Sequence, residues 1–109
     1  MKKNKIYFLF LLISLNFTLH AFSGGNGTET FPWIISTADD LNQMRNYLGI
    51  DNKDRFFKLL NNIELDIAPY NSQSGWNPVG NSVLPFCAHF NGNSFKISNL
   101  FINRPDHNN

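Results

Sequence analysis

The feature that most constrains the fold is an alternation of apolar and polar residues near the end of the chain. Residues 86–91, Phe-Cys-Ala-His-Phe-Asn, place two Phe and one Ala on one side of an extended chain and Cys and His on the other. An Asn-Gly-Asn turn at 91–93 follows, and the two-residue rhythm resumes over residues 95–102. This pattern predicts short strands joined by polar turns, and therefore a mostly β architecture.

The first 23 residues have the layout of a secretory signal. Three Lys lie within the first five positions, and an apolar run from Ile6 to Leu15 follows them. A membrane anchor is the alternative, but a spanning helix needs about 20 apolar residues and Asn16 interrupts this run early. Small residues at Ala21 and Ser23 predict cleavage after Ser23, with cleavage after Ala21 as the alternative. We therefore expect a bacterial protein that is secreted or held at the cell surface.

Removal of residues 1–23 changes the charge of the chain. Three of its nine Lys and Arg lie in that segment and all eight acidic residues follow it, so the remainder carries a net charge of −2. A nucleic-acid partner is not expected, since no basic patch exists. The remaining 86 residues make at most one small domain. Cys87 is the single cysteine, so an internal disulfide is excluded, and we expect a partly buried strand residue rather than a catalytic thiol.

One helix is predicted between two groups of strands. Phe31–Ile35 is a strand candidate. The hydroxyls of Ser36 and Thr37, with Asp three residues further on in each case, are typical of a helix N-terminus. Apolar residues then recur at spacings of three and four, which predicts a helix from about Ala38 to Leu48 that lies against the end of a sheet.

The segment after this helix changes to a strand pattern. Phe56–Leu60 and Ile63–Ile67 are strand candidates, and Asn61-Asn62 between them predicts a sharp bend because Asn tolerates the left-handed conformation. Asn is also abundant, with 15 in residues 24–109, which suits a chain with many tight bends. Turn-forming residues over 71–81 then lead to the terminal alternating segment.

Several segments in this order resemble the N-terminal part of large bacterial surface proteins that carry GLUG-type repeats. They are Gly-Thr-Glu (27–29), Ile-Ser-Thr-Ala-Asp-Asp-Leu (35–41), Phe-Lys-Leu-Leu-Asn-Asn-Ile-Glu-Leu (57–65), Gly-Trp-Asn-Pro-Val-Gly-Asn (75–81) and Phe-Cys-Ala-His-Phe-Asn-Gly-Asn-Ser-Phe-Lys-Ile-Ser-Asn-Leu (86–100). The resemblance implies a short N-terminal capping helix and the first coils of a right-handed parallel β-helix. Stacked coils of this kind need about three repeats to bury their faces.

The chain departs from the family in ways that predict a fragment. Asn91-Gly-Asn-Ser-Phe95 stands where the family has Asp-Gly-Asn-Gly-His, and Ala88 stands where it has Gly. The Gly-Leu-hydrophobic-Gly segment that names the repeat would follow Pro105, and the sequence ends first. The expected organisation is a signal peptide at 1–23, a leader and first strand at 24–35, and the capping helix with β-helix coils at 36–109, incomplete at the C-terminus.

Residues that could carry chemistry are few. Glu64 and Asp66 lie two apart on one strand, as paired carboxylates for glycoside hydrolysis would, but a solvated strand face is the simpler interpretation. Asp39-Asp40 is interpreted as a helix N-terminus. His89 and His107 have no spacing typical of a metal site.

The two tryptophans could stack on sugar rings, but we expect Trp33 to pack at the cap and Trp76 to anchor a loop. No catalytic, cofactor-binding or metal-binding residue is therefore predicted.

The predicted function is a non-enzymatic, adhesin-like module, secreted or at the cell surface, with a protein or glycan as its ligand. The alternative is the remnant of a polysaccharide-active β-helix enzyme. Because the coil formed by Phe86–Asn91 and Phe95–Ile102 would lack a following coil, its edge is also expected to self-associate.

Overall fold

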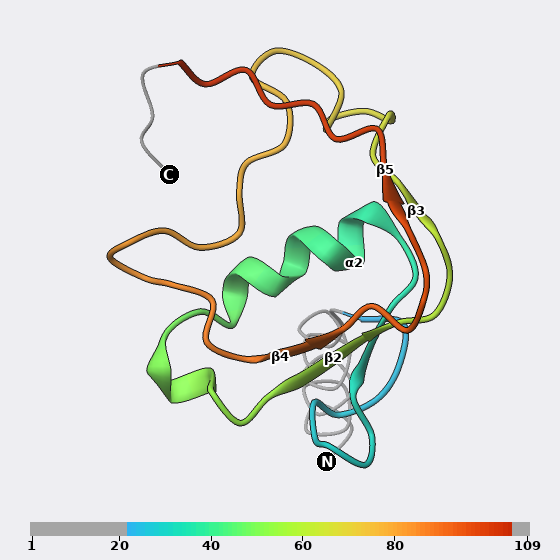
Figure 1. Cartoon of the computed structure of the whole chain (residues 1–109), viewed down its shortest axis with the longest axis vertical. Coiled ribbons are helices and arrows are strands. Elements are labelled where there is room, and N and C mark those ends of the chain that lie inside the picture. Colours follow the sequence, from blue (N-terminus) through green and yellow to red (C-terminus); the bar gives the residue numbers. More distant parts are fainter. Residues whose placement is uncertain (1–21, 106–109) are drawn as a thin grey trace, which may run out of the picture.

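The computed structural model describes residues 22–105, so most of the predicted signal peptide and His107 lie outside the described part (Figure 1). Two separate sheets are formed. The first contains β1 (Trp33–Ile35), β2 (Phe56–Leu59) and β4 (His89–Asn91) in that order, and the second pairs β3 (Ile63–Glu64) with β5 (Ile97–Ser98). All these strand pairs are parallel.

Helical segments occupy the space beside the sheets. The helix α2 (Ala38–Gln43) is continued by a 3₁₀ turn η1 (Met44–Asn46), and a second 3₁₀ turn η2 (Ile50–Asn52) precedes β2. Figure 1 shows the two sheets at an angle to each other, with α2 inside that angle.

The expectation of a mostly β chain, with a capping helix and the first coils of a right-handed parallel β-helix, is wrong. Residues 22–105 contain five strands of only two to four residues in two open sheets, with one α-helix, and no closed sheet or solenoid is formed among them. The predicted strand Ile63–Ile67 is paired only over Ile63–Glu64, although Leu65 is still buried.

Residues 65–88 account for this difference. Three of the five prolines lie in this stretch, and proline cannot donate a hydrogen bond to a β ladder. Its large apolar residues Trp76, Val79 and Phe86 pack beside α2 instead of extending a sheet. The stretch therefore forms a long irregular loop, which passes beside α2 in Figure 1.

The helix begins where its capping residues predict. Thr37 is the N-cap, and its hydroxyl accepts a hydrogen bond from the backbone N–H of Asp40 at 3.0 Å. The Asp40 carboxylate in turn accepts the backbone N–H of Ser36 at 2.9 Å. Regular α-helix ends at Gln43, earlier than expected, but α2 and η1 together cover most of the predicted Ala38–Leu48 span.

The core lies between the first sheet and the helix. Phe57 is 1% exposed, and its ring centroid lies 5.3 Å from that of Trp33 and 5.4 Å from that of Phe22. Leu41 and Met44 bring the apolar face of the helix to this cluster. Such close aromatic packing excludes water and stabilises this end of the molecule.

Asparagines form the corner between the two sheets, as the sequence predicts. The backbone of Asn93 has φ +52°, and the N–H of Phe95 donates to the Gly92 carbonyl at 2.9 Å, which closes a tight turn. On the neighbouring bend, Asn62 accepts the backbone N–H of Lys96 at 2.9 Å. The two bends are therefore bonded to one another across the corner.

Candidate binding surface

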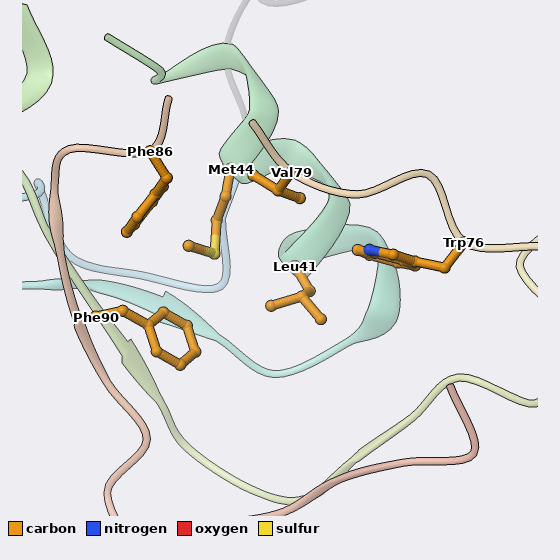
Figure 2. A pocket seen from close by; sticks show the side chains of 6 residues that line it. All are labelled: Leu41, Met44, Trp76, Val79, Phe86 and Phe90. Atoms are coloured by element: carbon orange, nitrogen blue, oxygen red, sulfur yellow. The ribbon is translucent and has the colours of Figure 1, made fainter. Parts of the chain in front are cut away.

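An apolar hollow lies between the helix, the long loop and β4. It has a volume of about 340 Å³. Figure 2 shows Leu41 and Met44 projecting from the helix, Trp76, Val79 and Phe86 from the loop, and Phe90 from β4. Every one of these six side chains is apolar. The hollow can therefore accept an apolar group, but it presents no side-chain acid, base or nucleophile to a bound molecule.

An open edge adjoins this hollow. We use "open edge" for residues 89–100, which contain β4 and β5. Its large apolar residues are between 38% and 58% exposed: Phe90, Phe95, Ile97 and Leu100. β4 is the outer strand of the first sheet, so one side of it has no neighbouring strand. Phe90 belongs to both features, so the hollow and the open edge adjoin at this residue.

Hydrogen-bond directions show which backbone groups remain free along the open edge. The N–H of His89 donates to the Arg55 carbonyl at 2.9 Å, and neighbouring residues of a strand direct their backbone groups to opposite sides. Phe90 therefore directs its N–H and carbonyl away from β2. The carbonyls of Lys96 and Ser98 accept bonds from the β3 side at 2.8 and 3.0 Å, so Ile97 also faces outward.

Glu64 and Asp66 are both exposed to solvent, as the simpler interpretation predicts, and the Glu64 carboxylate forms a clamp with Asn99. Asn99 Nδ2 donates to both carboxylate oxygens of Glu64, at 2.9 and 3.0 Å. The backbone N–H of Asp66 donates to Glu64 as well, at 2.8 Å. These bonds, with that from Asn99 the strongest, lower the pKa of Glu64. A general acid in glycoside hydrolysis needs a raised pKa, so this environment does not suit that role.

Both tryptophans serve the fold. Trp76 is 6% exposed and packs on the Tyr70 ring at a centroid distance of 5.0 Å, in agreement with the predicted loop anchor. Trp33 lies 4.4 Å from the Tyr47 ring, and the Arg55 guanidinium lies 5.4 Å from its centroid. Both indoles are therefore packed against other aromatic rings of the fold.

The remaining singled-out residues also have structural roles. The His89 ring stacks on Phe56 at 4.2 Å. Cys87 is a half-buried free thiol, as expected, but it precedes β4 and is not the strand residue that was predicted. Asp40 is buried and bonded at the helix N-terminus, as the sequence predicts. Asp39 accepts a 2.6 Å hydrogen bond from the Tyr70 hydroxyl. Burial first, and this bond second, raise the pKa of Tyr70 to about 12.

Sequence reasoning missed three of these arrangements. The Tyr70–Asp39 bond joins residues 31 apart, and the Asn99–Glu64 clamp joins residues 35 apart. No pattern among neighbouring residues of the sequence predicts such pairs. The hollow was also missed, although the sequence predicted the apolar helix face to which Leu41 and Met44 belong. Their companion Val79 lies in a turn-rich stretch that has no periodicity.

The fold and this surface define a small α/β domain with an open apolar edge. Within residues 22–105 no group of three or more His, Cys, Asp or Glu is placed to hold a metal ion. None of the helices in the same range is long and apolar enough to cross a membrane.

Comparisons with known proteins identify one relative of much greater length. No family model matches the chain, and no solved structure matches it. A protein of Evansella cellulosilytica, provisionally named a Gly-rich membrane protein, is 40% identical over 87 residues. The match covers 80% of this chain but only 10% of that protein, so the chain spans about a tenth of the length of its relative.

Proposed function

We propose that the chain is an exported, non-enzymatic interaction module that works at the cell surface by pairing its open edge with a second copy of itself. The observation that carries the proposal is the row of exposed apolar side chains beside unpaired backbone groups on β4 and β5. Uncovered strand edges are templates for pairing with another chain, and proteins that avoid this protect their edges.

Symmetry and charge favour a second copy as the occupant. Two copies related by a two-fold axis, which is the commonest symmetry of homodimers, place the same edge opposite itself in antiparallel register. Lys96 is the only Asp, Glu, Lys or Arg in residues 89–100, so two such edges repel one another weakly. Phe90 and Ile97 would lose their exposed apolar surface at the same contact, which adds hydrophobic stabilisation.

Two features support a location at the cell surface. The first is the signal-like N-terminus, with its Lys-rich start and short apolar run. The second is the relative, whose provisional name describes a membrane protein.

The polysaccharide-active alternative has no specific observation in its favour. Its candidate acids are Glu64, whose oxygens are occupied by the Asn99 amide, and Asp66, which accepts a 3.2 Å bond from Asn71. The hollow is mostly apolar, and the indole N–H of Trp76 is the one polar side-chain group among its lining residues. Absence of enzymatic activity therefore remains part of the proposal.

Sedimentation velocity of the exported chain, from low to high micromolar concentration, tests the association. We expect a concentration-dependent rise in sedimentation coefficient. Ile97→Lys should weaken association at least about tenfold, because it places a charge in the row that pairing would bury. The matched control is Val83→Lys, because Val83 is 90% exposed in a loop outside the open edge.

Circular dichroism of both variants verifies that each is folded. A wild-type chain that stays monomeric at high micromolar concentration would refute the proposal. So would an equal loss of association in the two variants, because the contact would then lie elsewhere or be nonspecific.

A further inference from the structure

We infer that export of this chain ends with hydrolysis of the peptide bond between Ala21 and Phe22, so that the mature protein begins at Phe22. Water adds across this bond, leaving a carboxylate on Ala21 and a free amino group on Phe22. The inference rests on the exported nature of the chain proposed above. The sequence alone allows cleavage after Ala21 or after Ser23, and the inference chooses between these two bonds.

Phe22 is a component of the core. Its side chain is 7% exposed, although it lies at the start of the described chain. Its ring centroid lies 5.2 Å from that of Trp33, 5.7 Å from that of Tyr47 and 5.4 Å from that of Phe57. Removal of this ring would leave a cavity among three aromatic side chains.

Ser23 is held in the fold by hydrogen bonds. Its hydroxyl donates to the Asp40 carboxylate at 2.5 Å, and its backbone N–H donates to the Ile34 carbonyl at 3.0 Å. Asp40 is buried, and the backbone of Ser36 is the other donor to the same oxygen. Loss of Ser23 would leave a buried carboxylate with one donor fewer, which is costly because buried charges need their hydrogen bonds.

Cleavage after Ser23 would discard both residues, whereas cleavage after Ala21 keeps them. Signal peptidases require a small residue immediately before the bond, and Ala21 and Ser23 both satisfy this. At the position three before the bond, the later site has Ala21 and the earlier site has Leu19, so the local motif favours the later one. The fold favours the earlier site instead, because residues 22 and 23 both make contacts that hold the folded structure together.

The direct test is the N-terminus of the exported protein. The full chain is expressed in a bacterial host, the exported fraction is isolated, and its intact mass and N-terminal sequence are determined. We expect a chain beginning at Phe22. A chain beginning at Gly24 would overturn this inference while leaving export intact. Retention of the uncleaved chain inside the cell would overturn both this inference and the proposed export.

A second experiment measures what the two residues do for the fold. Two chains are released from a cleavable tag so that one begins at Phe22 and the other at Gly24, and their thermal unfolding is compared. The shorter chain should unfold roughly 10–20 °C lower. The chain from Phe22 with Ser23→Ala should fall between the two, since it keeps the ring but loses the hydroxyl. Equal midpoints for the two chains would remove the structural reason for the inference.

Discussion

Two adjacent phenylalanines on β2 should respond very differently to truncation. Phe57 is 1% exposed and contacts the Trp33 ring, whereas Phe56 is only partly buried on the opposite side of the strand, where it stacks on His89. Truncation of a fully buried Phe to Ala typically costs about 3–5 kcal/mol, because a cavity remains. Truncation of Phe56 leaves an indentation that water fills, so we expect about 1–2 kcal/mol.

The difference is large for a small domain, whose whole stability is about 5–15 kcal/mol. Urea unfolding followed by tryptophan fluorescence measures it directly, since Trp33 lies in the same cluster as Phe57. If Phe57→Ala fails to fold, Phe57→Leu keeps most of the volume and should cost less than Phe57→Ala while still exceeding Phe56→Leu. Equal costs at the two positions would refute the assignment of the inward face of β2.

Three further predictions concern titration, capping and backbone conformation. The absorbance of tyrosinate should show that Tyr70 ionises near pH 12. The pKa of Tyr70 in the folded chain is raised above its unfolded value of about 10. The stability that this group contributes is therefore complete below pH 10 and is lost as the pH rises towards 12. Asp39→Asn should move this titration downward, and an unchanged curve would contradict the 2.6 Å bond. Thr37→Ala should lower the free energy of unfolding by about 1 kcal/mol whereas Thr37→Ser should not, and equal effects would argue against the N-cap. Gly27→Ala should destabilise the fold by more than about 1 kcal/mol, because the backbone has φ +80° and the new methyl group would lie 2.8 Å from the Trp33 ring; a neutral result in urea unfolding would contradict this geometry.

Local patterns in the sequence were sufficient to locate the helix start and the approximate positions of the strands, but most strands are shorter than predicted: the alternating segments 86–91 and 95–102 are strand only over His89–Asn91 and Ile97–Ser98. The Thr37 cap, the apolar helix face and the strand candidate Phe56–Leu60 depend only on neighbours a few positions away, and each lies close to where the sequence predicts it. The bends at Asn61-Asn62 and Asn91-Gly92-Asn93 were both predicted. Of these residues only Asn93 has a positive φ, so the bend at Asn61-Asn62 forms without the left-handed conformation that was expected there.

The combination of these elements was decided only by the tertiary structure. Whether Trp76 and Phe86 extend a sheet or cover a helix depends on which surfaces meet, and this choice turned an expected β-helix into two short open sheets. The Glu64–Asn99 clamp and the burial of Phe22 likewise join positions that are distant along the chain. Sequence patterns report the preferences of single segments, whereas burial and partner choice depend on the free energy of the whole packed molecule, and no single segment carries that information.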